Sequence, residues 1–212
     1  MLAEDEPCLE KLGIQAIKQP GEFWEKLNQL PVIRHGLPKD AKRALEKALP
    51  DPKMEYSVVR REAGLGSLGQ QRFVAIANWE GGFLAREAKA MVPSACLWLE
   101  GHTGHHRSYY EEAIRSAVRS HDPYQFIVGR WLIRRLSPDS NPIEIMAVPK
   151  KKDEETFLRV MGAEAANVHL GSKRPIKRIL QDMDGRKSNW LRDAAKLMAR
   201  MVERDWKEYR KR

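Results

Sequence analysis

The residues that decide the fold are YSVVRREAGLGSLGQQRFVAIANWEGGFLAREAK, at positions 56–89. Residues of high strand propensity, β-branched and aromatic, stand on both sides of the glycines. The pattern predicts a strand at 56–61, a glycine turn, a second strand at 72–79 and, after a short turn, a third at 83–89. The other parts of the chain are arranged around this unit of three strands.

The glycine turn GLGSLG, at positions 64–69, has the spacing G-x-G-x-x-G. A dinucleotide-binding loop leads from a strand into a helix, whereas this one leads into a second strand, which disfavours that interpretation. A loop that joins two antiparallel strands and covers phosphates is typical of protein kinases. Glycine suits it because the backbone must approach anionic oxygens closely. We therefore expect the backbone amides of Gly64, Gly66, Ser67 and Gly69 to bind nucleotide phosphates.

In kinases a lysine on the third strand completes the phosphate site. Here Lys89, which lies 25 residues after Gly64, is the candidate, and Arg86 is the alternative. The competing interpretation is a glycine-rich hairpin that binds no ligand, because a short motif of this kind also occurs by chance.

The pattern along the chain predicts three segments. A helical N-terminal segment, 1–54, contains helices at 22–30 and 39–49. A sheet segment, 55–149, adds a fourth strand at 125–136 and a fifth at 143–148, separated by a proline-rich turn. A helical segment, 150–212, follows, with a helix that Asp153 caps and that runs to His169, a short helix ending near Met183, and a terminal helix that Ser188 caps.

Between the third and fourth strands we expect a loop at 97–107 and then a helix that Ser108 caps and that runs to about Arg119. The histidines of that loop have no thiol or carboxylate to complete a ligand set, so no metal site is predicted. Glu111 and Glu112 occupy the first turn of the helix, where the helix dipole favours carboxylates. In a kinase small lobe a helical glutamate at this stage pairs with the strand lysine, so either residue is a candidate partner of Lys89.

The net charge of +9 lies mostly in the C-terminal tail. Residues 171–212 hold 14 Lys and Arg against 6 Asp and Glu, whereas residues 1–170 are nearly balanced. Apolar residues from Trp190 to Tyr209 recur at helical spacing between the charges. This pattern favours a packed helix with a charged outer face over nucleic-acid binding, because no nucleic-acid-binding motif accompanies the charge.

Composition indicates a globular chain of 212 residues that would remain in the cytoplasm. No apolar run is long enough to cross a bilayer, and the N-terminus is acidic where a secretory signal would be basic. Two cysteines, Cys8 and Cys96, form no disulfide framework, which is consistent with a reducing compartment.

Five short segments resemble, in order, the bacterial family called domain of unknown function 2252. They are REAGLGSLGQQR (61–72), REAK (86–89), PSA (93–95), RRLSPD (134–139) and NVHLG (167–171). The resemblance extends from about residue 56 to the C-terminus. It implies an α+β, protein-kinase-like fold: a five-stranded antiparallel sheet with a glycine-loop hairpin and one helix, flanked by helical N- and C-terminal segments.

The chain lacks two motifs of that family, Gly-Asp-x-His-x-x-Asn and Asp-Phe-Asp, which resemble the catalytic and metal-binding parts of kinase-like phosphotransferases. Asp182-Met183-Asp184-Gly185 has a superficial likeness to Asp-Phe-Gly but lies where a helix should end. We therefore expect a chain that holds ATP, with Mg²⁺, weakly and does not transfer phosphate alone. A separately encoded segment would supply the missing carboxylates; alternatively, the scaffold is a non-catalytic interaction module that associates with itself or a partner.

Overall fold

The computed structural model of this chain describes residues 20–62, 69–93, 95–101, 109–138, 151–172 and 174–211. Contacts divide the chain into two compact units, one ending at Val168 and one beginning at His169. The division into three segments that the sequence predicts stays a prediction. The elements, in chain order, are α2 (Pro20–Asn28), α3 (Lys39–Glu46), β1 (Tyr56–Arg60), β2 (Arg72–Trp79), β3 (Gly82–Ala90), α4 (Ala95–Leu99), α5 (Tyr110–Ser116), β4 (Phe126–Val128), β5 (Trp131–Leu136), α6 (Lys151–His169), α7 (Ile176–Gly185) and α8 (Trp190–Tyr209).

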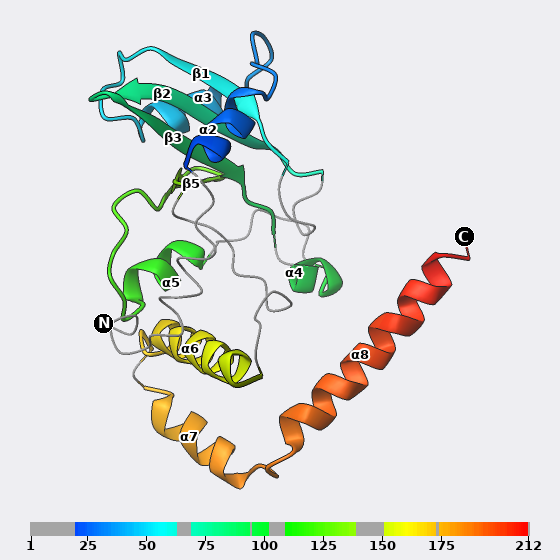
Figure 1. The fold of residues 1–212 in the computed structure, drawn as a ribbon. Coiled ribbons are helices and arrows are strands. Elements are labelled where there is room, and N and C mark those ends of the chain that lie inside the picture. The colour runs from blue at the N-terminus through cyan, green and yellow to red at the C-terminus, as the bar shows by residue number, and fades with distance from the viewer. Residues whose placement is uncertain are drawn as a thin grey trace. The chain divides into compact units, whose positions relative to one another are not determined.

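The described strands form one five-stranded antiparallel sheet in the order β1-β2-β3-β5-β4 (Figure 1). This confirms the predicted α+β class and the antiparallel sheet. β3 is central because it pairs with β2 on one side and with β5 on the other. Its side chains are therefore flanked by strands that are far apart in the sequence.

The prediction of a single fourth strand at 125–136 was wrong, because β4 and β5 form a hairpin there. Val128 pairs with Trp131, and the two residues between them make the turn. Gly129 has φ +58°, a left-handed conformation that glycine adopts without a Cβ clash. The predicted strand at 143–148 lies outside the described residues. The fourth and fifth strands of the described sheet are therefore β4 and β5.

β2 and β3 are joined by a two-residue turn in which both residues have positive φ. Glu80 has φ 49° and Gly81 has φ 82°, and the flanking Trp79 and Gly82 are paired. Positive φ at both central positions defines a type I′ turn, whose twist matches that of the flanking strands. Glycine is favoured in this conformation, whereas glutamate is strained in it.

Each face of the sheet packs against one N-terminal helix. α3 inserts Ala41, Ala44 and Leu45 into a cluster with strand residues of the first face, among them Phe73 and Trp131. α2 contributes Leu27 to a smaller cluster on the second face. Side chains alternate between faces along a strand, so neighbouring residues of β3 serve different clusters. The strand residues of the second cluster are Val59, Val74, Ile76, Ala85 and Leu136.

Other element boundaries differ from the predictions. The short helix α4 (Ala95–Leu99) occupies part of the predicted loop at 97–107. α5 has Tyr109 at its N-cap and ends at Ser116, while the predicted cap Ser108 lies outside the described residues. α6 begins at Lys151, so Asp153 lies inside the helix and not at its first residue. The N-cap of α8 is Asn189, not Ser188.

In the second unit, α7 and α8 have no buried residues. The apolar side chains of α8, which the sequence predicted to pack, are exposed, among them Leu191, Met198 and Val202. The amphipathic pattern is present, but its apolar stripe is not buried by any described residue of this unit.

Candidate functional site

The base of the glycine loop is held by backbone pairing between β1 and β2. The amide of Arg61 donates to the carbonyl of Arg72 over 3.1 Å, one residue beyond the last pair of β1. Gly64, Gly66 and Ser67 lie outside the described residues. Gly69 has φ +80°, which explains why glycine is placed there. Arg61 and Arg72 are thus the two residues from which the loop departs and to which it returns.

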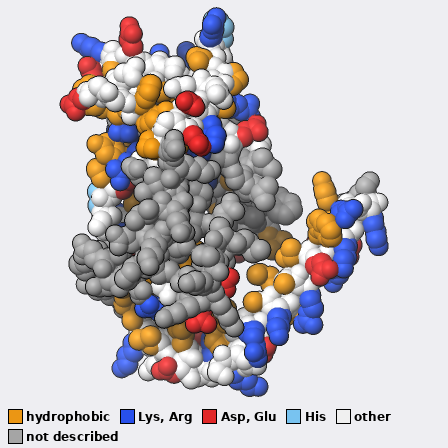
Figure 2. Space-filling model, viewed as in Figure 1, with side chains coloured by type: hydrophobic (Ala, Val, Ile, Leu, Met, Phe, Trp, Pro, Cys, Tyr) orange, Lys and Arg blue, Asp and Glu red, His pale blue; other side chains and the backbone are white. Residues whose placement is uncertain are grey.

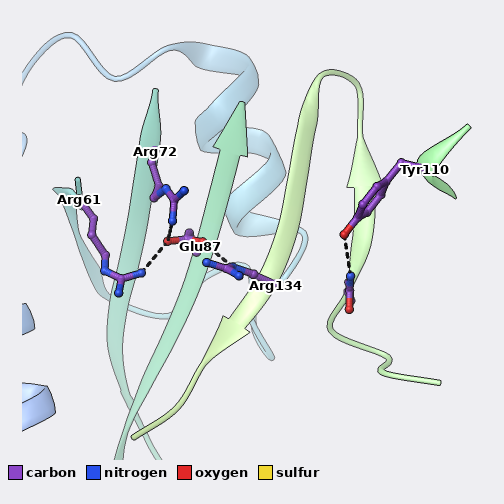
Figure 3. Close-up of polar contacts among 6 residues, drawn as sticks. Arg61, Arg72, Glu87, Tyr110 and Arg134 are labelled. Carbon is purple, nitrogen blue, oxygen red and sulfur yellow. Dashed lines mark hydrogen bonds and ion pairs between the residues drawn. The ribbon is translucent and has the colours of Figure 1, made fainter. Parts of the chain in front are cut away.

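These two arginines converge on a carboxylate that the sequence analysis did not identify. Glu87, on β3, is fully buried, and three guanidinium groups surround it (Figure 3). The Nη1 of Arg61 donates to Oε1 over 3.0 Å, and the Nη1 of Arg72 lies 3.4 Å from the same oxygen. The Nε of Arg134 donates to Oε2 over 2.5 Å. One buried carboxylate on β3 therefore links β2, β5 and the residue that follows β1.

The network places surplus positive charge on the second face of the sheet. A buried carboxylate is costly unless it is paired and hydrogen-bonded, and one arginine would neutralise it. Three arginines leave the group with a net charge of about +2. The side chain of Arg72 is buried, whereas those of Arg61 and Arg134 are 30% and 43% exposed. The surplus charge is therefore accessible to solvent on two sides of Glu87.

Lys89 lies on this same face. It is two residues after Glu87 on β3, its register partner on β2 is Arg72, and it is half-buried. Lys89 therefore adds a fourth cation near the base of the glycine loop. This is the placement that a phosphate-binding lysine would need.

Arg86 faces the opposite side of the sheet. Its Nε donates to the carbonyl oxygen of Ala48 over 3.1 Å, just beyond the end of α3. Its guanidinium lies 4.3 Å from the centre of the Tyr124 ring. Burial lowers the pKa of Arg86 from its ordinary value, and the nearby Arg135 adds to the effect. Arg86 thus serves the packing of α3, and the structure does not bring it together with Lys89.

The structure does not bring Lys89 and the candidate glutamates together either. Glu111 and Glu112 are exposed in the first turn of α5, and the Glu112 carbonyl accepts a hydrogen bond from the Ser116 hydroxyl. Among the described residues no ion pair joins Lys89 to either carboxylate. The carboxylate that lies on the face of Lys89 is Glu87, from its own strand.

Asp182 in α7 is paired with Arg186, the residue that caps the C-terminal end of that helix. Its Oδ2 accepts a hydrogen bond from the Nε of Arg186 over 2.6 Å, one helical turn later. Within the described ranges, no three His, Cys, Asp or Glu side chains gather as a metal site would require.

Glu87 had a signal in the sequence that was missed. It is a charged residue that follows Arg86 and precedes Ala88, inside a predicted strand that also holds the small apolar residue Ala85. Such a residue on a central strand must be paired, because a buried charge without a partner is strongly unfavourable. The identities of its partners could not be read from the sequence, because they lie 15, 26 and 47 residues away.

No protein-family model, curated protein or solved structure matches this chain. The described part of the chain has no helix that combines the length and the apolar character needed to span a membrane. The site is therefore interpreted from its own residues.

Proposed function

We propose that the chain is a nucleotide-binding module built on a sheet like that of a kinase small lobe. The glycine loop would cover the phosphates, with backbone amides of Gly64, Gly66, Ser67 and Gly69 as donors and Lys89 as the cation. One observation carries the proposal: Arg61, Arg72 and Lys89 lie on one face of the sheet where the glycine loop leaves β1 and enters β2. Anionic oxygens attract such a group of donors.

Two further features support this function. The sheet order β1-β2-β3-β5-β4 places the strand of Lys89 beside the glycine-loop hairpin. The motifs that resemble domain of unknown function 2252 include both the glycine loop and β3. Arg86 is not favoured as the phosphate cation, because its guanidinium contacts Ala48 on the other face.

Phosphoryl transfer would require further residues. The reaction uses a carboxylate to orient the nucleophile and others to hold Mg²⁺, and the sequence lacks the family motifs that would supply them. Magnesium would reach this chain bound to ATP, and a separately encoded segment would complete the site. ATP binding would be consistent with a location in the bacterial cytoplasm, where Cys8 and Cys96 would stay reduced.

Isothermal titration calorimetry of the full chain with Mg²⁺ and ATP tests the proposal. Lys89→Ala should weaken binding by about tenfold, because a charge-assisted phosphate contact is lost. Lys53→Ala is the matched control, since Lys53 is exposed in the loop that precedes β1. A folded wild-type chain that binds no ATP, or equal weakening by both variants, would contradict the proposal.

A second candidate function is an interaction module, favoured by the exposed apolar stripe of α8. Leu191, Leu197, Met198, Val202 and Trp206 are all more than half exposed. In Figure 2 the hydrophobic side chains lie mainly along one side of this helix, and the Lys and Arg side chains lie mainly along the other. Contiguous apolar surface of this kind is typical of protein contact sites.

Sedimentation equilibrium tests whether the chain associates with itself through α8. If the stripe mediates self-association, the average mass should rise with concentration, and Met198→Glu should suppress the rise. Lys196→Gln, which changes the net charge by the same −1 at a polar position of α8, should have less effect. A wild-type chain that stays monomeric at high concentration would argue against self-association.

A further inference from the structure

The further inference concerns the surplus charge around Glu87, and it rests on the proposed function because both involve the same face of the sheet. Arg61 and Arg134 approach opposite oxygens of the carboxylate, Oε1 and Oε2. They come from opposite sides of β3: one follows β1, and the other belongs to β5 (Figure 3). The buried Glu87 therefore holds two partly exposed guanidinium groups at fixed positions on the sheet surface.

Stability alone does not explain three arginines. Arg72 is buried beside Glu87 and suffices to neutralise it. Arg61 and Arg134 are partly exposed, and each adds a charge that the carboxylate no longer balances. Lys89 contributes another on the same face. A planar guanidinium is the side chain that best matches phosphate oxygens in geometry and charge.

We propose that Arg61 and Arg134, together with Lys89, bind a phosphate group of a polyphosphate chain. The ligand class is then defined by its phosphates, so inorganic tripolyphosphate should bind as ATP does. Glu87 is a positioning residue: it orients both guanidinium groups and limits the positive charge of the site. The anion binds beside the carboxylate, to the exposed parts of the two arginines.

This assignment predicts that two substitutions change the affinity for tripolyphosphate in opposite directions. Arg134→Gln removes a phosphate donor, so tripolyphosphate should bind about fivefold to tenfold more weakly. Glu87→Gln removes the negative charge but keeps the shape of the side chain, so tripolyphosphate should bind more tightly. If the network were only structural, neither change would alter anion binding in a folded protein.

The chain offers a matched control beside Arg134. Arg135 is the next residue of β5 and faces the other side of the sheet, where its Nε lies 3.4 Å from Asp122 and its guanidinium lies 5.8 Å from the Tyr124 ring centre. Arg135→Gln removes the same charge from the same strand. It should leave tripolyphosphate affinity nearly unchanged, apart from the small long-range effect of one charge.

The experiment is calorimetry of the wild-type chain, the three variants and Lys89→Ala with sodium tripolyphosphate, ATP and adenosine. Circular dichroism first establishes that each variant is folded. Tripolyphosphate should bind, adenosine should not, and Arg134→Gln should weaken both phosphorylated ligands. If Glu87→Gln does not fold, the comparison of Arg134→Gln with Arg135→Gln decides the test.

Three outcomes separate this inference from the proposed function. If Lys89→Ala weakens ATP binding but Arg134→Gln does not, the inference is overturned and the glycine-loop function stands. If Arg134→Gln weakens tripolyphosphate binding while Lys89→Ala leaves ATP binding unchanged, the inference stands for the two arginines, and the role of Lys89 is overturned both here and in the proposed function. Equal losses in Arg134→Gln and Arg135→Gln would show an effect of net charge only, and would overturn the inference.

Discussion

The Nε of Arg134 on β5 donates to the Oε2 of Glu87 on β3 over 2.5 Å, although 47 residues separate them in the chain. This contact adds a side-chain link to the backbone pairing of the two strands, in which Glu87 and Arg134 are register partners. With Arg61 and Arg72 on the other oxygen, the carboxylate connects the glycine-loop hairpin to the β4–β5 hairpin. The same group therefore bears on stability and on the proposed binding of anions.

Removal of the Glu87 carboxylate should destabilise the fold strongly. Glu87→Ala leaves a buried Arg72 and two neighbouring arginines without their counter-charge, so we expect a loss of about 3–5 kcal/mol in the free energy of unfolding. Urea denaturation followed by circular dichroism measures this loss. Glu25→Ala, at an exposed position of α2, should change it by less than about 0.5 kcal/mol. A loss at Glu87 as small as that of the control would contradict the assigned role.

Arg86 and Lys89 should separate stability from binding. Arg86→Ala removes a buried guanidinium that donates to Ala48 and stacks on Tyr124, so it should cost about 1.5–3 kcal/mol of stability. Lys89→Ala should cost less, because Lys89 is only half-buried, and should instead weaken ATP binding. Thermal melts and ATP titrations of both variants provide the check. If folded Arg86→Ala protein loses ATP affinity and Lys89→Ala protein does not, then Arg86 and not Lys89 is the phosphate cation.

Tyr56 should make stability depend on pH in the alkaline range. Its hydroxyl donates to the Oε1 of Glu46 over 2.9 Å, and burial, followed by this hydrogen bond, raises the pKa of Tyr56 to about 12. Because the folded-state pKa lies above the unfolded value, the stabilisation is complete below about pH 10 and is lost as the pH rises through 12.

Tyr56→Phe should therefore lower stability at pH 8 and flatten its decline between pH 10 and 12. Urea denaturation at several pH values compares the two proteins, and the difference between them isolates Tyr56 from other groups that titrate there. Parallel pH profiles for wild type and variant would show that the Tyr56 pKa is not raised by folding.

The β2–β3 turn offers a stabilising substitution. Glu80 has φ 49°, a conformation that costs most L-residues about 1–2 kcal/mol and that asparagine tolerates better. Glu80→Asn should raise the free energy of unfolding by up to about 1 kcal/mol, seen as a higher melting temperature. Glu62→Asn, outside a turn of this kind, should give no such gain. A lower melting temperature for Glu80→Asn would show that Glu80 makes a contact that outweighs its backbone strain.

The sequence by itself determined the three strands of the unit at 56–89, the glycine-containing turn between β2 and β3 and most of the described helices, since strand propensity, glycine and amphipathic spacing are local properties. Alternation along β3 also requires that Arg86 and Glu87 face opposite sides. Gly129 was a local signal for the β4–β5 turn, but one glycine inside an apolar run does not distinguish a turn from a strand.

Only the tertiary structure decided which helix covers each face and which charges meet. Arg86 reaches a carbonyl 38 residues away, and Glu87 gathers arginines from three other parts of the chain. The cost of a buried charge predicts that Glu87 has partners. It does not identify them, because their approach depends on strand order and register, which form only when the two hairpins pair across β3.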